Sequence, residues 1–219
     1  MDYQADDLKN ALTILQQGGV ILYPTDTIWG LGCDATNEEA VRRIFQIKQR
    51  SDSKALILLI DSLTTLRRYV PIDNYPADIL TALIPYLQPQ SPNQKDQSTI
   101  QSDHSINHQI KPTTIIYPQV THLPDFLKAQ DGSVAIRITR ETFSHDLCAA
   151  LNRPLISTSA NISGQPSPQF FGQINPHIRA AADYICTYRQ DDLNPAQPST
   201  ILQLSQTPDH RFSFHVIRP

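Results

Sequence analysis

The chain has 219 residues, of which 40% are hydrophobic and 18% are charged, a composition typical of a globular protein of one domain or one domain with a small appendage. Its 18 basic and 21 acidic residues give a net charge of −3. This balance excludes a strongly basic nucleic-acid coat protein and an acidic tail, although not a local basic patch.

Apolar residues recur at helical or strand spacing along most of the chain. In chain order we expect a helix at 6–17, a strand at 20–23, a helix from 36 to about 48, a strand at 55–60, helices near 62–69 and 76–87, strands at 113–117 and 133–139, a helix at 142–151, a strand at 155–159, a helix near 169–182, and strands at 183–188, 199–204 and 212–217. This alternation predicts an α/β fold in which helices flank an open, twisted, mixed β-sheet with some antiparallel strands.

Two helices carry end signals in the sequence. Gly18 and Gly19 follow the first helix and provide a C-terminal stop. Residues 36–39 (Thr-Asn-Glu-Glu) match a capping box, in which the Thr hydroxyl and the Glu carboxylate bind free backbone amides. We therefore expect the second helix to begin at this box.

Residues 88–111 differ in composition from everything around them. They are rich in Gln, Ser, Asn and Asp, and their only aliphatic residues are Ile100, Ile106 and Ile110. Such a stretch cannot bury enough apolar surface to offset its ordering entropy. We predict a flexible polar insertion within one domain that spans 4–219.

The three cysteines, Cys33, Cys148 and Cys186, are widely spaced and form no C-x-x-C pair, which argues against a disulfide framework and a zinc site. We expect them to be buried thiols. The N-terminus carries no signal-peptide pattern, and the longest apolar run, 55–60, is too short to cross a membrane. These features predict a soluble cytoplasmic protein.

Two segments bring small polar or basic residues to the ends of buried elements. Residues 23–32 (Tyr-Pro-Thr-Asp-Thr-Ile-Trp-Gly-Leu-Gly) carry Thr25 and Thr27, which face the same side of an extended backbone, and two glycines that permit close approach of a ligand or a neighbouring strand. The alternative is a hairpin turn with Thr in ordinary β positions. Residues 47–54 carry three cations within seven residues, which either gather phosphates or complement a helix dipole.

Two predicted strands carry unexpected polar residues. Arg137 lies in the middle of the strand at 133–139, where it needs a carboxylate partner from the protein or from a ligand. Ser157, Ser159 and Asn161 recur with a period of two at the end of the strand at 155–159, so they line one face. Hydroxyls and an amide in that place suit phosphate or ribose oxygens, and an ordinary Ser-rich turn is the alternative.

Several well-known catalytic patterns are missing from the sequence. It contains no P-loop, no G-x-G-x-x-G fingerprint, no G-x-S-x-G elbow and no H-E-x-x-H pair. The seven histidines are scattered, which argues against a metal cage. Hydroxyls and cations without a marked nucleophile favour chemistry by positioning and charge neutralisation, as in phosphoryl or nucleotidyl transfer.

Taken together, these segments resemble the YrdC family, the threonylcarbamoyl-adenylate synthases that start the threonylcarbamoyl modification of adenosine in tRNA. The matching pieces are 23–32, 48–50 (Lys-Gln-Arg), 132–137 (Gly-Ser-Val-Ala-Ile-Arg), 157–168 (Ser-Thr-Ser-Ala-Asn-Ile-Ser-Gly-Gln-Pro-Ser-Pro), 198–201 (Pro-Ser-Thr-Ile) and 217–219 (Ile-Arg-Pro). Their order and spacing match over nearly the whole chain. Two places depart from many relatives: Ser51 stands where Pro is common, and Ile110-Lys-Pro-Thr-Thr replaces a Trp-Pro-Gly-Pro segment.

The resemblance implies a YrdC-like domain over 4–219 with a deep, positively lined concave surface. It implies a cytoplasmic enzyme that joins L-threonine, bicarbonate and ATP, with magnesium (Mg2+), giving threonylcarbamoyl-AMP and pyrophosphate. It also implies tRNA or double-stranded RNA as a further partner, together with downstream proteins that transfer the threonylcarbamoyl group to tRNA.

The resemblance also implies two groups of site residues. ATP would be contacted by Lys48 and Arg50 at its phosphates, by Ser159 and Asn161 beside the nucleotide, and by Ser133, Ser167 and Arg218. Threonine would be contacted by Thr25 or Thr27, Arg137, Ser157 and Ser199, with Arg137 at its carboxylate. No residue is expected to act as acid or base, since catalysis would consist of cation clamping and alignment.

Two other functions fit the sequence less well. A YrdC-like module that binds RNA or matures ribosomes without making the adenylate would not need both the Lys-x-Arg and the Ser-x-Asn elements. A carbamoyltransferase-like piece of a larger protein is disfavoured because the chain looks complete. The leading hypothesis is the synthase.

Overall fold

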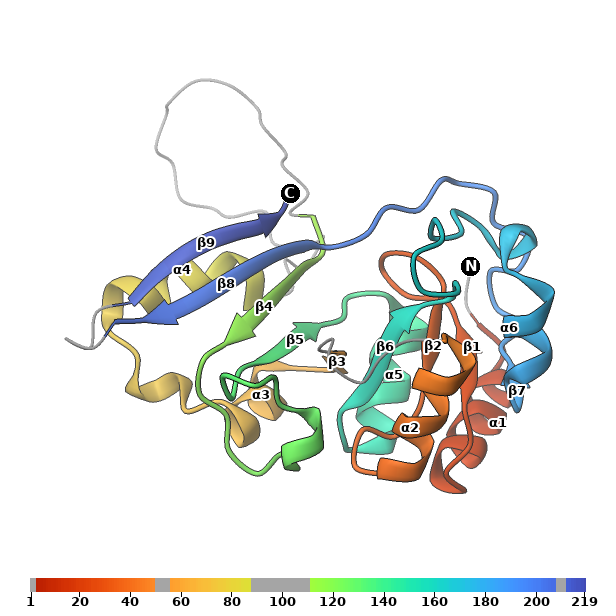
Figure 1. Cartoon of the computed structure of the whole chain (residues 1–219), viewed down its shortest axis with the longest axis horizontal. Helices are drawn as coiled ribbons and strands as arrows, with labels where there is room; N and C mark the ends of the chain where they lie inside the picture. The colour runs from red at the N-terminus through yellow and green to blue at the C-terminus, as the bar shows by residue number, and fades with distance from the viewer. Residues whose placement is uncertain (1–2, 50–55, 88–110, 208–211) are drawn as a thin grey trace.

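The computed structural model describes residues 3–49, 56–87, 111–207 and 212–219 (Figure 1). Within these ranges nine strands form one mixed sheet in the order β7-β1-β2-β6-β3-β5-β4-β8-β9. The strands are β1 (Ile21–Tyr23), β2 (Gly30–Gly32), β3 (Ile57–Ile60), β4 (Thr113–Tyr117), β5 (Val134–Ile138), β6 (Leu155–Ser159), β7 (Tyr184–Ile185), β8 (Thr200–Gln206) and β9 (Phe212–Arg218). The pairs β1–β7, β3–β5 and β4–β8 are parallel and the others antiparallel, which confirms the predicted mixed α/β sheet.

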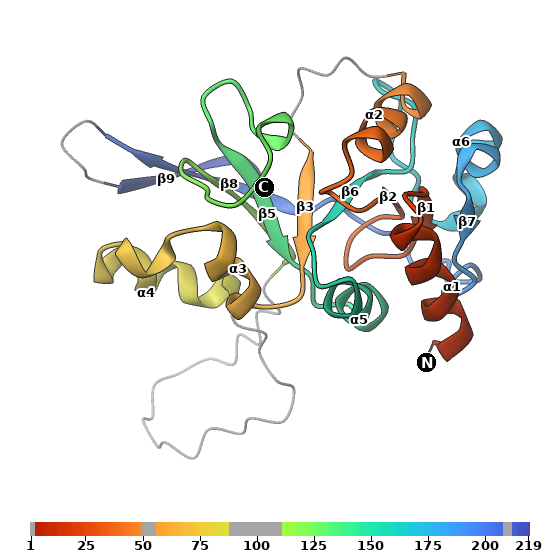
Figure 2. The same ribbon diagram turned by 90° about the horizontal axis from the view of Figure 1, so that it is seen from below.

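Helices flank this sheet on both sides. They are α1 (Ala5–Gln16), α2 (Glu38–Ile47), α3 (Leu63–Tyr69), α4 (Ala77–Leu87), α5 (Thr142–Leu151) and α6 (Pro176–Ala181), with short 3-10 turns at Ile72–Asn74, Asp125–Leu127 and Phe171–Gln173. Figure 2 shows α1 and α5 on one face of the sheet and α2 on the opposite face. Strands β1 and β3 are therefore covered on both faces, and they are apolar on both, whereas β9 is largely exposed.

Alternation along the strands divides the core between the two faces. Ile21 of β1 and Leu59 of β3 belong to an apolar cluster with α1 and α5, whereas Leu22 and Leu58 belong to a larger cluster that includes α2. Successive side chains of a strand point to opposite faces, so each short strand contributes to both clusters. This is why runs such as 20–23 and 55–60 are apolar throughout.

The two glycines of β2 allow this strand to lie against a bulky neighbour. A Cβ atom at Gly32 would lie 2.6 Å from Cε1 of Tyr23 and 2.7 Å from the carbonyl oxygen of Ile156, and one at Gly30 would lie 3.1 Å from the same ring atom. The prediction that these glycines permit close approach of a neighbouring strand is confirmed. β1 and β2 form a hairpin, but Thr25 and Thr27 lie in its loop and not in strand positions.

The predicted capping box at residues 36–39 is wrong by one residue. Asn37 is the N-cap of α2, and its side-chain oxygen accepts a hydrogen bond from the backbone N–H of Ala40 at 3.1 Å. The Thr36 hydroxyl instead donates to Oδ1 of Asp34 at 2.7 Å. Thr36 is held by Asp34 through its hydroxyl and its backbone N–H, and Asn37, which caps at least as well as Thr, takes the cap position.

The helix predicted near 169–182 is wrong in its first half. Only Pro176–Ala181 is α-helical, and Asn175 caps it by accepting from the N–H of His177 at 2.9 Å. Proline at the first helical position disfavours helical backbone in the residue before it, so the helix begins at Pro176. The strand predicted at 183–188 is also shorter, since only Tyr184 and Ile185 pair with β1.

The insertion predicted at 88–111 lies outside the described residues, apart from Lys111.

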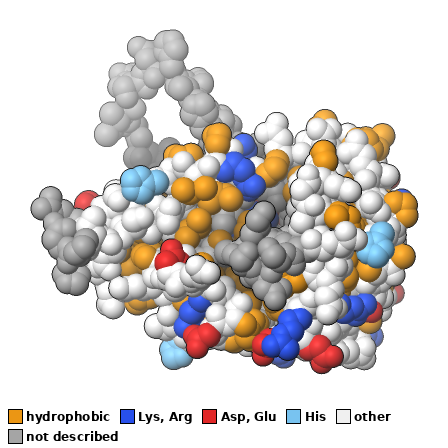
Figure 3. All heavy atoms as spheres, in the orientation of Figure 1, with side chains coloured by type: hydrophobic (Ala, Val, Ile, Leu, Met, Phe, Trp, Pro, Cys, Tyr) orange, Lys and Arg blue, Asp and Glu red, His pale blue; other side chains and the backbone are white. Residues whose placement is uncertain are grey.

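Figure 3 shows hydrophobic side chains gathered over β8 and β9, and Val216 and Ile217 of β9 are 64% and 56% exposed. The described helices include none that is long and apolar enough to cross a membrane. All three cysteines are buried and unpaired, as expected from the sequence.

Candidate functional site

A cavity of about 320 Å³ lies between the β1–β2 hairpin and β6 on one side and β5, β8 and β9 on the other. Its described lining consists of six hydroxyl side chains (Thr27, Ser157, Thr158, Ser159, Ser167 and Ser199), two guanidinium groups (Arg137 and Arg218) and an otherwise mostly apolar wall (Ile28, Trp29, Gly30, Leu56, Ile57, Ile116, Ala135, Pro198 and Ile201). Among these lining residues there is no Asp or Glu. The cavity therefore suits an anionic ligand that also has apolar surface.

The β1–β2 loop brings two hydroxyls together at the edge of this cavity. Oγ1 of Thr25 lies 2.9 Å from Oγ1 of Thr27, and it also donates to the carbonyl of Ile28 at 2.8 Å. The backbone N–H of Thr27 donates to the Thr25 hydroxyl at 3.0 Å. Thr27 lines the cavity, whereas Thr25 holds the loop in shape behind it.

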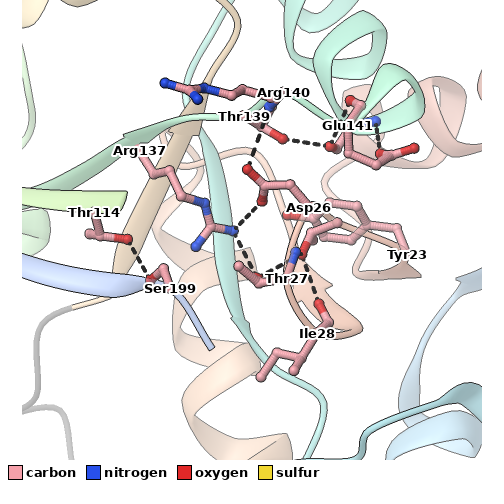
Figure 4. A network of polar contacts seen from close by, with 12 residues as sticks. Tyr23, Asp26, Thr27, Ile28, Thr114, Arg137, Thr139, Arg140, Glu141 and Ser199 are labelled. Atoms are coloured by element: carbon pink, nitrogen blue, oxygen red, sulfur yellow. Dashed lines mark hydrogen bonds and ion pairs between the residues drawn. The ribbon is translucent and has the colours of Figure 1, made fainter. Parts of the chain in front are cut away.

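Arg137 is almost fully buried, and its guanidinium reaches the cavity from the middle of β5 (Figure 4). Its Nη2 lies 3.1 Å from Oδ1 of Asp26 and donates to Oγ1 of Thr27 at 3.2 Å. The sequence indicated that this arginine needs a carboxylate partner, and the protein supplies one. Arg137 nevertheless lines the cavity, so a ligand carboxylate has access to it as well.

Ser199 lies on the other side of Arg137 from Asp26 in Figure 4, and it forms a second polar group with Arg218 of β9. Nε of Arg218 donates to the carbonyl of Ser199 at 2.9 Å, and Nη2 donates to its hydroxyl at 3.2 Å. The Ser199 hydroxyl also lies 2.9 Å from the hydroxyl of Thr114 on β4. Partial burial, followed by repulsion from Arg137, lowers the pKa of Arg218. Both guanidinium groups line the same cavity.

Ser157 and Ser159 at the end of β6 line the cavity, as predicted, but Thr158 between them lines it too, so alternation alone does not explain the lining. Asn161 lies beyond the strand, where its side-chain oxygen accepts from the hydroxyl of Ser159. The ammonium group of Lys48 donates to the carbonyls of Ser159 and Asn161, the second at 2.8 Å. Lys48 is 2% exposed and lies behind the cavity lining, so it fixes the turn that follows β6.

The three remaining residues predicted to contact ATP differ in whether they line the cavity. Ser167 lines the cavity. Ser133 does not, and its hydroxyl donates to Oδ1 of Asp131 at 2.6 Å, which helps to lower the pKa of that carboxyl. Arg50, the second cation of the Lys-x-Arg element, lies outside the described residues.

Two site residues were missed in the sequence, Asp26 and Thr114. Asp26 lies between the two threonines that were singled out, and Arg137 was expected to need a carboxylate, so these two signals together point to it. Thr114 contacts Ser199 across 85 positions of sequence, and nothing local marks it. In the described part of the chain, no group of three or more His, Cys, Asp or Glu residues lies close enough to hold a metal ion.

The chain is similar to a known protein family and to named relatives. The Sua5/YciO/YrdC family model, described as telomere recombination, matches residues 13–218. Two curated relatives are named threonylcarbamoyl-AMP synthase. The relative from Xylella fastidiosa (strain 9a5c) is 35% identical over 171 residues, 78% of this chain and 80% of the relative. The relative from Xanthomonas euvesicatoria pv. vesicatoria (strain 85-10) is 34% identical over 195 residues, 89% of this chain and 91% of the relative.

Solved structures show the same fold. The crystal structure of E. coli YciO superposes with a TM-score of 0.74 at 22% identity, covering 99% of this chain and 90% of that one. The crystal structure of P. abyssi Sua5 complexed with L-threonine superposes with a TM-score of 0.73 at 22% identity, covering 100% of this chain and 55% of that one. At these identities the likeness concerns the fold alone.

Proposed function

The chain belongs to the Sua5/YciO/YrdC family, and we propose that it is a threonylcarbamoyl-AMP synthase. It joins L-threonine, bicarbonate and ATP and releases pyrophosphate. The observation that carries this proposal is the charge of the cavity: two guanidinium groups and six hydroxyls line it, without a carboxylate among the described lining residues. Each substrate has an anionic group, namely the carboxylate of threonine, bicarbonate itself and the phosphates of ATP, and such a lining binds these groups without repulsion.

The proposed reaction has two steps. The amine of threonine and bicarbonate form an N-carboxylate with loss of water, and an oxygen of that carboxylate attacks the α-phosphate of ATP. The bond between the α-phosphorus and the bridging oxygen breaks, and pyrophosphate leaves with that oxygen. Both steps join anions or bring them close, so neutralisation and alignment reduce the barrier more than proton transfer does.

We assign the threonine end of the cavity to the β1–β2 loop and the middle of β5. Arg137 binds the α-carboxylate, since a guanidinium pairs with a carboxylate through directed hydrogen bonds. Thr27, Ser157 and Ser199 line the cavity and provide hydroxyls for the polar atoms of threonine. Thr25 keeps Thr27 in place through the contact between the two hydroxyls.

We assign the nucleotide end to the turn after β6 and to the end of β9. Ser159, Ser167 and Arg218 line the cavity and offer donors to phosphate or ribose oxygens. Asn161 and Lys48 hold the Ser159 turn from behind. The resemblance also suggests Ser133 and Arg50 as nucleotide contacts, but Ser133 does not line the cavity and Arg50 lies outside the described residues. Magnesium enters as MgATP, a substrate, and hard oxygen ligands from phosphates and water suffice for it.

The proposal extends to the domain, the location of the protein and the use of its product. Residues 4–219 form one domain, and the protein works in the cytoplasm. The product is an activated carbamoyl group, which a separate protein transfers to adenosine in tRNA. Direct contact between this chain and RNA is not needed for the adenylate-forming step.

The experiment is a pyrophosphate-release assay with purified protein, ATP and magnesium, in which L-threonine and bicarbonate are omitted in turn. The proposal expects release only when both are present. Release without threonine would indicate a simple ATP hydrolase. No release from folded protein would favour a YrdC-like RNA-binding module, and tRNA affinity would then be measured.

A further inference from the structure

Asp26 lies behind the guanidinium of Arg137, away from the cavity lining. Its side chain is 7% exposed, and its Oδ1 is 3.1 Å from Nη2 of Arg137. Its other oxygen, Oδ2, accepts a hydrogen bond from the backbone N–H of Arg140 at 3.4 Å. The carboxylate thus connects the β1–β2 loop to β5 and to the chain that follows β5.

The contacts of Arg137 are concentrated on one nitrogen. Within the described residues, Nη2 forms an ion pair with Oδ1 of Asp26 and donates a hydrogen bond to Thr27. Neither Oδ1 of Asp26 nor the buried Nε of Arg137 has a hydrogen-bond partner there. A guanidinium has five N–H donors, and an ideal pair with a carboxylate uses two of them side by side. Within the described ranges, the protein therefore holds this group at Nη2. Because Nε is enclosed, a ligand in the cavity would meet the guanidinium at its terminal nitrogens.

The loop that holds this nitrogen is itself rigid. Thr25 and Thr27 contact each other, and Thr25 closes the loop onto the carbonyl of Ile28. Asp26 lies between these two residues, so its carboxylate is presented from a backbone that has little freedom. A long arginine side chain loses its rotamer freedom when it is held in this way, before any ligand arrives.

We propose that Asp26 is a positioning residue for threonine binding: it fixes the Arg137 guanidinium so that its terminal nitrogens meet the α-carboxylate of L-threonine. This inference rests on the proposed function. A carboxylate beside Arg137 offsets part of the attraction that this group exerts on an anion, so the direction of its donors matters in addition to its charge. Orientation of the donors is what the pair contributes.

The two roles of Asp26 predict opposite effects on threonine binding. If Asp26 only offsets the charge of Arg137, its removal increases the positive charge at the cavity, and threonine binds more tightly. If Asp26 positions Arg137, its removal frees the guanidinium, and threonine binds more weakly. The direction of the change in the threonine KM therefore separates the two roles.

The test compares Asp26→Asn with Asp34→Asn. Asp34 is a matched control because it is also a buried carboxylate paired with an arginine, Arg153, and it lies outside the cavity lining. We expect Asp26→Asn to raise the threonine KM about ten-fold or more, as for a lost partner of a charged group, with the ATP KM nearly unchanged. We expect Asp34→Asn to lower thermal stability without changing either KM.

Asp26→Glu provides a second variant in case the Asn variant does not fold. It keeps the charge that the buried arginine needs and moves the carboxylate by one methylene. We expect a folded protein with a raised threonine KM and an unchanged ATP KM. Calorimetric titration of L-threonine alone gives a readout that does not depend on turnover, and we expect the same order of affinities.

The outcomes separate this inference from the proposed function. If the wild type is active and both Asp26 variants bind threonine as well as the wild type or better, the positioning role is wrong and the synthase stands. If ATP and threonine KM values rise together, Asp26 has a general structural role, which also overturns the inference. Wild-type protein that neither binds L-threonine nor releases pyrophosphate overturns both.

Discussion

Replacement of Lys48 by Met tests whether this buried cation supports the nucleotide end of the cavity. Met has nearly the same length but no donors, so the change leaves the carbonyls of Ser159 and Asn161 without the ammonium group. An unsatisfied buried acceptor costs roughly 1–3 kcal/mol, and both residues are only half-buried, which places the total near 2 kcal/mol. For a chain of this size that corresponds to a fall in Tm of about 4–8 °C.

The same substitution has a functional consequence. The turn that carries Ser159 loses its support, so we expect the ATP KM to rise about ten-fold or more while the threonine KM changes little. Differential scanning fluorimetry and steady-state pyrophosphate release measure the two effects. Lys9→Met, at an exposed position of α1, is the control and should change neither. An ATP KM and a Tm equal to those of the control would refute the assignment of Lys48.

Three further predictions concern the fold and the threonine end. Gly32→Ala should lower Tm by several degrees or prevent folding, because its Cβ would lie 2.6 Å from the ring of Tyr23; thermal unfolding measures this. Arg137→Ala should abolish threonine-dependent pyrophosphate release, and it should also lower Tm because it leaves a buried carboxylate unpaired; activity near wild type would remove it from the site. The hydrogen bond from Arg43 lowers the pKa of Asp183 below its usual 3.8, so this carboxylate stabilises the fold above about pH 4 and the contribution is lost as pH falls further. Asp183→Asn should therefore lose less Tm between about pH 6 and pH 3 than the wild type does, and an equal loss would contradict the pairing.

Much of the fold was predictable because its elements are locally encoded. The strands at 113–117 and 155–159 and the helix at 142–151 have the predicted bounds, since each has strong periodicity and clear flanking residues. The errors arise where a single local contact decides the outcome. The hydroxyl of Thr36 donates to Asp34, and Pro176 determines where α6 begins.

The candidate site was predictable in its residue types more than in its contacts. The hydroxyl residues at the end of β6 were predicted at the site, although Thr158 lines the cavity as well as Ser157 and Ser159. The cost of burying Arg137 indicated that it needs a partner. Which carboxylate serves as that partner depends on how the β1–β2 loop folds over β5, and sequence spacing does not determine this. The position of Lys48 behind the turn after β6 depends on packing between α2 and β6 in the same way.

The most direct test of the central claim is isotope tracing of the product. Purified protein is incubated with MgATP, L-threonine and carbon-13 bicarbonate, and the nucleotide products are separated and analysed by mass spectrometry. The proposed synthase predicts an AMP conjugate that contains both threonine and the labelled carbon, formed in step with pyrophosphate. AMP or ADP without such a conjugate, from protein shown to be folded, would contradict the synthase assignment.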